Sequence, residues 1–137
     1  MVEVSLRATH ESPLTLGEEH VLLLWQVTAR AEELLTAVDS GRWPAAELAA
    51  LAGFARTEVL RQASEEEARL FPDVPAQHAT GLTRDHARLR SAAELLTRAA
   101  TGEQFMSAAQ IAAAVRDYVA QFERHLRNEE CLTASAR

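Results

Sequence analysis

The sequence predicts an all-α protein, an up-down-up-down four-helix bundle with a short N-terminal arm. Ala, Leu, Glu and Arg dominate the composition, and the chain has only five Gly and four Pro, which favours helix over strand. Apolar residues recur at spacings of three and four over long segments, and Pro or Gly lies between the segments. The length of 137 residues suits one domain. We expect an arm over residues 1–14 and one bundle over residues 15–137.

Each expected helix has a recognisable limit. Gly41 and Gly102 follow the first and third apolar stripes and act as C-terminal stops. Pro44 opens the second helix, where its missing N–H costs nothing. The third helix starts at Ala76 or only after Gly81. The four expected helices cover residues 15–38, 44–70, 76 or 82 to 101, and about 104 to 132. Long helices with short connections predict an antiparallel bundle.

Charge and hydropathy exclude several classes of protein. The formal charge is −6 without a basic run, so a nucleic-acid partner is not expected. No apolar run approaches the roughly 20 residues of a membrane span, so a membrane protein is not expected either. The segment MVEVSLRATHESPL lacks the features of a signal peptide, and Cys131 alone cannot form an intrachain disulfide. We expect a soluble, cytoplasmic protein.

Polar residues interrupt all four apolar stripes at one end of the expected bundle. In an antiparallel bundle, the starts of the first and third helices lie beside the ends of the second and fourth. The interrupting residues are His20 and His86 near helix starts, and Gln62, Glu66, His125 and Glu129 near helix ends. A buried imidazole or carboxylate is costly without a partner, so we expect these side chains to converge.

The residue types in this cluster predict a metal site. Imidazole and carboxylate ligands without thiolates favour Fe, Mn or Zn. A pair at i and i+4 spans about 6 Å along a helix, which suits two neighbouring ions or one ion with additional residues beside its ligands. No His follows a Glu at the Glu-x-x-His spacing. The spacing here is His-x-x-x-Glu, complete at His125 and Glu129 and broken at Gln62 and Glu66.

Four segments resemble those of the hemerythrin-like, HHE cation-binding domain family, over about residues 15 to 133. They are GEEHVLLLWQV, RQASEEEARLFPDV, RDHARLRSAAELL and FERHLRNEECL. The resemblance implies a four-helix bundle with a non-haem, often dinuclear, iron centre bridged by carboxylates. It also implies that the metal ligands are His20, Glu66, His86, His125 and Glu129.

One position departs from the family pattern. Gln62 stands where the second helix should carry His, and an amide oxygen is a far weaker iron ligand than imidazole. One metal position is therefore expected to be weak, open or lost. Gln62 and His78 are additional candidates, as ligands or as neighbours of ligands, and His78 lies eight residues before His86.

The remaining polar residues near the cluster have simpler interpretations. Glu67 and Glu130 are expected on solvated faces. Glu19 is expected to favour the positive end of the first helix dipole. Tyr118 is expected in the core with its hydroxyl hydrogen-bonded.

Three functions stay open from the sequence. The leading one is an iron protein, with Mn or Zn as alternatives, that binds or senses O₂, NO or peroxide rather than a dedicated enzyme. The second is a small iron-dependent oxidoreductase that uses the coordination position left open by Gln62. The third is a metal-free structural or regulatory bundle.

Overall fold

The structure, a computed structural model, describes residues 16–69 and 71–136, with side chains described for residues 17–69 and 71–131. The arm predicted over residues 1–14 lies outside the described residues. The elements are α2 (Leu16–Asp39), α3 (Ala45–Phe54), η1 (Ala55–Val59), α4 (Leu60–Arg69), η2 (Phe71–Asp73), α5 (Ala76–Thr101) and α6 (Ala108–Ala136). The described part is helical without strands, which confirms the predicted class.

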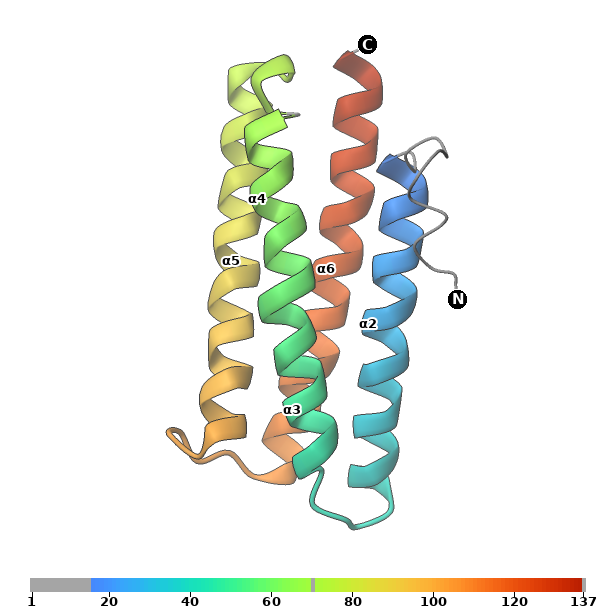
Figure 1. The fold of residues 1–137 in the computed structure, drawn as a ribbon, viewed down its shortest axis with the longest axis vertical. Coiled ribbons are helices and arrows are strands. Elements are labelled where there is room, and N and C mark those ends of the chain that lie inside the picture. Colours follow the sequence, from blue (N-terminus) through green and yellow to red (C-terminus); the bar gives the residue numbers. More distant parts are fainter. Residues whose placement is uncertain (1–15, 70, 137) are drawn as a thin grey trace, which may run out of the picture.

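The helices form four antiparallel rods, because α3, η1 and α4 continue as one rod (Figure 1). The start of α2, the end of α4, the start of α5 and the end of α6 lie at the same end of the bundle. The rod begun by α3 packs against α2 and α5, and α6 packs against the same two helices. The predicted up-down-up-down bundle is confirmed. No helix in the described part is long and apolar enough to cross a membrane.

The helix ends follow local hydrogen bonding. Gly41, at φ 79°, closes α2: its N–H donates to Val38 O at 3.0 Å, and the N–H of Arg42 donates to Ala37 O at 2.9 Å. This is a Schellman motif, and it needs the left-handed conformation that Gly adopts readily. Gly102, at φ 85°, stands in the left-handed region at the end of α5. The predicted ends of these two helices at Gly41 and Gly102 are therefore confirmed.

The start of α6 differs from the sequence-based prediction. The helix begins at Ala108, not near residue 104, because Ser107 and Gln110 form a capping box. The backbone N–H of Gln110 donates to Ser107 Oγ at 3.1 Å, and the backbone N–H of Ser107 donates to Gln110 Oε1 at 2.8 Å. The third helix starts at Ala76, the earlier of the two predicted starts.

A single π-turn, η1, interrupts the second rod, and the sequence-based prediction did not include it. Such turns insert an extra residue and rotate the helix that follows. From Val59, the last residue of η1, the buried face continues through Gln62 and Glu66. The π-turn is thus placed just before the polar end of the core.

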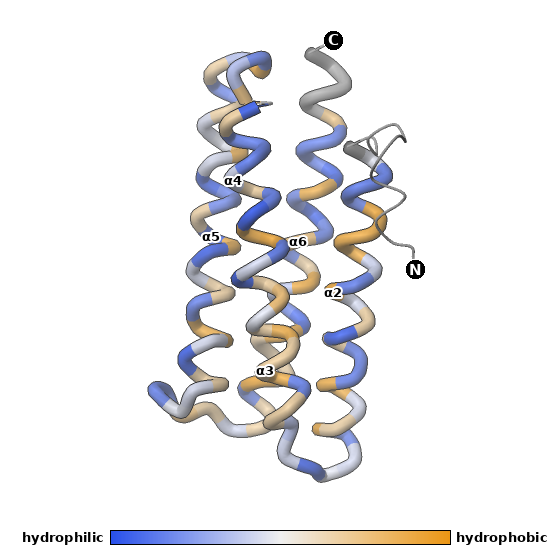
Figure 2. Tube along the Cα trace, in the orientation of Figure 1, coloured by the Kyte–Doolittle hydropathy of each residue, from blue (hydrophilic) through white to orange (hydrophobic). Residues whose placement is uncertain are grey.

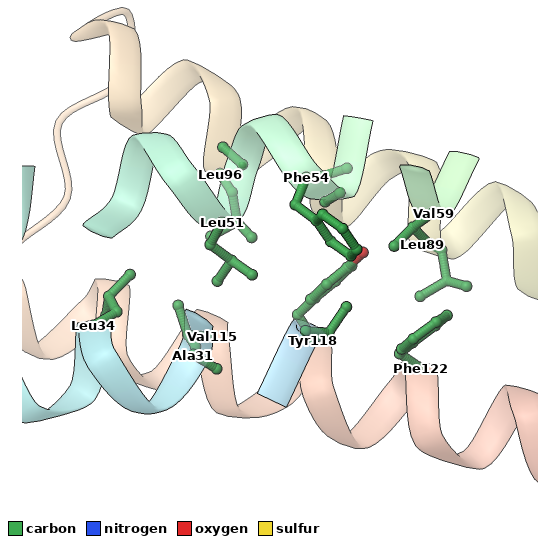
Figure 3. Close-up of a cluster of buried hydrophobic side chains, with 14 of the residues drawn as sticks. Ala31, Leu34, Leu51, Phe54, Val59, Leu89, Leu96, Val115, Tyr118 and Phe122 are labelled. Atoms are coloured by element: carbon green, nitrogen blue, oxygen red, sulfur yellow. The ribbon is translucent and has the colours of Figure 1, made fainter. Parts of the chain in front are cut away.

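The core has an apolar part and a polar part. Figure 3 shows apolar side chains from all four rods meeting, with Tyr118 extending across the bundle toward Phe54. Figure 2 shows the change along the second rod, where α3 is mostly apolar and α4 mostly hydrophilic. Tyr118 is fully buried, as predicted, but its hydroxyl has no hydrogen-bond partner in the described part. Burial raises the pKa of this hydroxyl.

Candidate metal centre

The structure brings the predicted polar residues together at one end of the core. All six are at most 7 % exposed, although each is polar or ionisable. Burial of this many such groups needs mutual pairing or a bound cation. They are His20 on α2, Gln62 and Glu66 on α4, His86 on α5, and His125 and Glu129 on α6.

Two carboxylates form the middle of the cluster, with one imidazole on one side and two on the other. On one side, His20 Nε2 lies 3.0 Å from Glu66 Oε2 and 2.8 Å from Glu129 Oε1. On the other side, His86 Nε2 lies 3.5 Å from Glu66 Oε1 and 3.7 Å from Glu129 Oε2. His125 Nε2 lies 3.5 Å from the same oxygen of Glu129. Each carboxylate therefore turns one oxygen toward His20 and the other toward His86.

The donor atoms fit a metal cation. Ligand atoms of Glu66, His86, His125 and Glu129 all lie within 4.8 Å of one another. Nε2 of His86 and Nε2 of His125 are buried without a hydrogen bond in the described part of the chain. Unsatisfied buried nitrogens are costly, and a cation accepting their lone pairs would remove that cost. The mixed imidazole and carboxylate set suits Fe, Mn or Zn.

The outer nitrogen of each imidazole also faces a carboxylate. Nδ1 of His20 lies 2.9 Å from Glu130 Oε2, and Nδ1 of His86 lies 2.7 Å from Glu67 Oε2. Nδ1 of His125 lies 3.3 Å from Asp85 Oδ2. A carboxylate that accepts the Nδ1 proton leaves Nε2 as the metal-binding nitrogen and fixes the ring orientation.

These outer carboxylates correct the sequence-based interpretation. Glu67 and Glu130 are partly exposed, but their carboxylates contact imidazoles and are not simply solvated. The sequence-based interpretation does not include Asp85. Their position in the sequence could have identified them, because each of the three acids is next to a cluster residue. Glu67 follows Glu66, Glu130 follows Glu129, and Asp85 precedes His86. A residue beside the inward stripe lies at the edge of a helix, where it can reach the neighbouring helix.

Aromatic packing holds two of the imidazoles. The ring of Phe71, in η2, stacks on His86 with centroids 5.3 Å apart and an interplanar angle of 20°. The rings of His86 and His125 meet edge to face at 4.6 Å. These contacts restrict the rotation of both imidazoles, so the two nitrogens that lack hydrogen bonds stay directed at the carboxylate pair.

Without a cation, the cluster retains protons. Burial alone would lower the pKa of His20, but Glu129 and Glu66 outweigh it and raise the pKa to about 10. For His86, burial is likewise outweighed by Glu129, Glu66 and Glu67, which raise the pKa to about 10. Burial opposes ionisation of Glu129, yet the three imidazoles hold its pKa below the ordinary value. Burial raises the pKa of Glu66. A cation would therefore replace protons on the imidazoles.

The two additional candidates are in different places. Gln62 is buried one turn before Glu66 on α4, and its amide nitrogen donates to Glu19 Oε1 at 3.4 Å. Glu19 thus has a contact beyond its predicted role at the helix dipole. His78 is half-buried and lines a cavity of about 350 Å³ with Asp85 and Cys131. In the described part of the chain, no hydrogen bond or ion pair joins His78 to the cluster.

The fold and the cluster together define a four-helix bundle with a buried cation-binding site. The hemerythrin HHE cation-binding domain model matches residues 15–133. The chain belongs to this family. Neither a curated protein nor a solved structure matches it significantly.

Proposed function

We propose that this protein is a non-haem iron protein, with two iron ions per chain, that binds or senses O₂, NO or peroxide. The observation that carries the proposal is the two-sided arrangement of the carboxylates. Glu66 and Glu129 each direct one oxygen to His20 and the other toward His86, so the pair could hold a cation on each side. Iron supplies the affinity for O₂ and related small molecules.

Other side chains of the protein orient the imidazoles and balance the charge of a cation bound between them. Glu130, Glu67 and Asp85 accept the Nδ1 protons, so that Nε2 of each imidazole is the donor atom. Glu66 and Glu129 neutralise cation charge that would otherwise be buried. Below the cluster, Phe122 and Leu89 belong to the apolar core, which limits the access of water from that direction.

A polar cavity of about 230 Å³ favours a small ligand. His125 and Asp85 are among its lining residues, so it reaches one edge of the cluster. Drug-sized ligands occupy about 300–1,000 Å³. The cavity therefore has room for O₂, NO or peroxide at the edge of the cluster.

The test is an optical titration of iron-reconstituted protein. The metal-free protein is loaded with Fe²⁺ without oxygen, desalted and exposed to O₂ or NO. We expect stoichiometric retained iron and a spectrum that changes with each gas. His125→Ala should abolish both, whereas His78→Ala, which removes an imidazole outside the cluster, should retain them. Iron that is lost on desalting, or equal spectra for both variants, would reject the proposal.

A further inference from the structure

The two sides of the carboxylate pair offer different donor atoms. On the side of His86 and His125, two imidazole nitrogens face Glu66 and Glu129. On the opposite side, His20 is the one imidazole that the described residues supply. Because the carboxylates are shared, the difference between the two sides depends on what lies beside His20.

The amide of Gln62 connects α4 to the residue that precedes His20 on α2. Gln62 is one turn before Glu66 on α4 and is 7 % exposed. Its amide nitrogen donates to Glu19 Oε1, and Glu19 directly precedes His20 on α2. An amide has a nitrogen that only donates and an oxygen that can bind a cation. Since Glu19 engages the nitrogen, the oxygen is the end that is left for a cation.

We infer that Gln62 and Glu19 make the His20 side an oxygen-rich position that accepts Mn²⁺ more readily than the imidazole-rich side does. Gln62 supplies its amide oxygen as a ligand, and Glu19 is a positioning residue that holds the amide nitrogen. The donors are then one imidazole nitrogen and three oxygens, against two nitrogens and two oxygens on the other side. Carboxylate and carbonyl oxygens suit Mn²⁺, whereas imidazole suits Zn²⁺ and iron.

This inference rests on the proposed function, because both positions share Glu66 and Glu129. It is supported by buried Nε2 atoms of His86 and His125 that lack hydrogen bonds, which show that the cluster needs a cation on the opposite side too. The two sides would then fill in order. The imidazole-rich side takes the first ion of Zn²⁺ or iron, and the His20 side takes a harder ion beside it.

The test is a sequential titration of the metal-free protein. One equivalent of Zn²⁺ is added first, and Mn²⁺ is then titrated while the electron paramagnetic resonance signal of free Mn²⁺ is followed. We expect the first Zn²⁺ to bind, followed by one Mn²⁺ per chain. Glu19→Ala should weaken Mn²⁺ binding about 10- to 100-fold, the usual effect of removing a partner of a ligand, and should leave the Zn²⁺ step unchanged. Glu33→Gln, an exposed change on the same helix, is the matched control.

A second variant separates coordination from simple packing. Gln62→Leu keeps a side chain of similar size but removes the amide oxygen, so Mn²⁺ should bind the His20 side more weakly while the Zn²⁺ step stays unchanged. If Gln62 only packed, Mn²⁺ binding would not change. The inference is overturned if Zn²⁺ binds first but Glu19→Ala and Gln62→Leu both titrate with Mn²⁺ like the unmodified protein. Failure of the first Zn²⁺ to bind would instead reject the cation site itself.

Discussion

At the scale of single residues, each imidazole of the cluster lies between carboxylates on both of its nitrogens. Nε2 of His125 faces Glu129, and its Nδ1 faces Asp85. Asp85 also accepts a hydrogen bond from Arg88 at 2.9 Å. Asp85 therefore connects the solvated surface of α5 to a predicted ligand on α6, and its role is testable without altering any predicted ligand.

Asp85→Asn should weaken metal binding about 10- to 100-fold, because an amide is a poorer acceptor for the Nδ1 proton of His125. Isothermal titration of the metal-free protein with Fe²⁺ or Zn²⁺ measures the affinity. Asp117→Asn is the control. Asp117 lines the cavity of about 230 Å³ together with Asp85 and His125, but it accepts its hydrogen bond from Gln121. Equal affinities for the two variants would contradict the role assigned to Asp85.

The metal-free protein should lose stability as the pH rises from about 7 to about 10. The folded-state pKa of both His20 and His86 is about 10, above the ordinary value of 6.5. Between these values the folded state binds more protons than the unfolded state, so the free energy of unfolding falls with rising pH. The stabilisation from the two protonated imidazoles is complete below pH 6.5 and is lost as the pH passes through 10.

Urea unfolding of chelator-treated protein across this pH range measures the effect. His20→Gln should show a shallower loss of stability with pH, because one of the two proton-binding groups is gone. Metal affinity should change in the opposite direction and increase with pH, since the cation competes with protons for the imidazoles. A metal-free protein whose stability is constant or rises over this range would contradict the account of the cluster.

At the scale of the helices, the apolar pattern predicted the four rods and which residues face inward. The same pattern predicted that His20, Glu66, His86, His125 and Glu129 converge, because a spacing of three and four fixes a helix face. It did not predict the contacts of Glu19, Glu67 and Glu130. Such residues lie beside the inward stripe, and their partners depend on the distance and rotation between helices, which spacing alone does not give.

The start of α6 is an element whose stability can be tested apart from the site. Ser107→Ala removes the side-chain acceptor for the N–H of Gln110, so it should lower the free energy of unfolding by about 1 kcal/mol. Ser107 directly precedes α6, and the start of α6 lies at the opposite end of the bundle from its other end, which carries His125 and Glu129 (Figure 1). Urea unfolding measures the loss, and metal stoichiometry should stay unchanged. A change in stoichiometry would mean that the two ends of the bundle are coupled.

At the scale of the whole molecule, a bound cation should stabilise the bundle by joining all four rods. A ligand at 100 times its Kd that binds only the folded state adds about 2.7 kcal/mol. For a domain of this size, we expect Tm to rise by about 10 °C on metal addition and to fall again with chelator. Differential scanning calorimetry checks this. A Tm that responds to neither treatment would favour the metal-free structural bundle.

The central claim is that a cation binds between Glu66 and Glu129 in the bundle core. Anomalous scattering at the iron edge, from crystals of iron-reconstituted protein, tests it directly. We predict two anomalous peaks, one toward His20 and one toward His86 and His125, both within ligand distance of the carboxylate pair. Iron that is stoichiometric in solution but gives no peak between these carboxylates would contradict the claim.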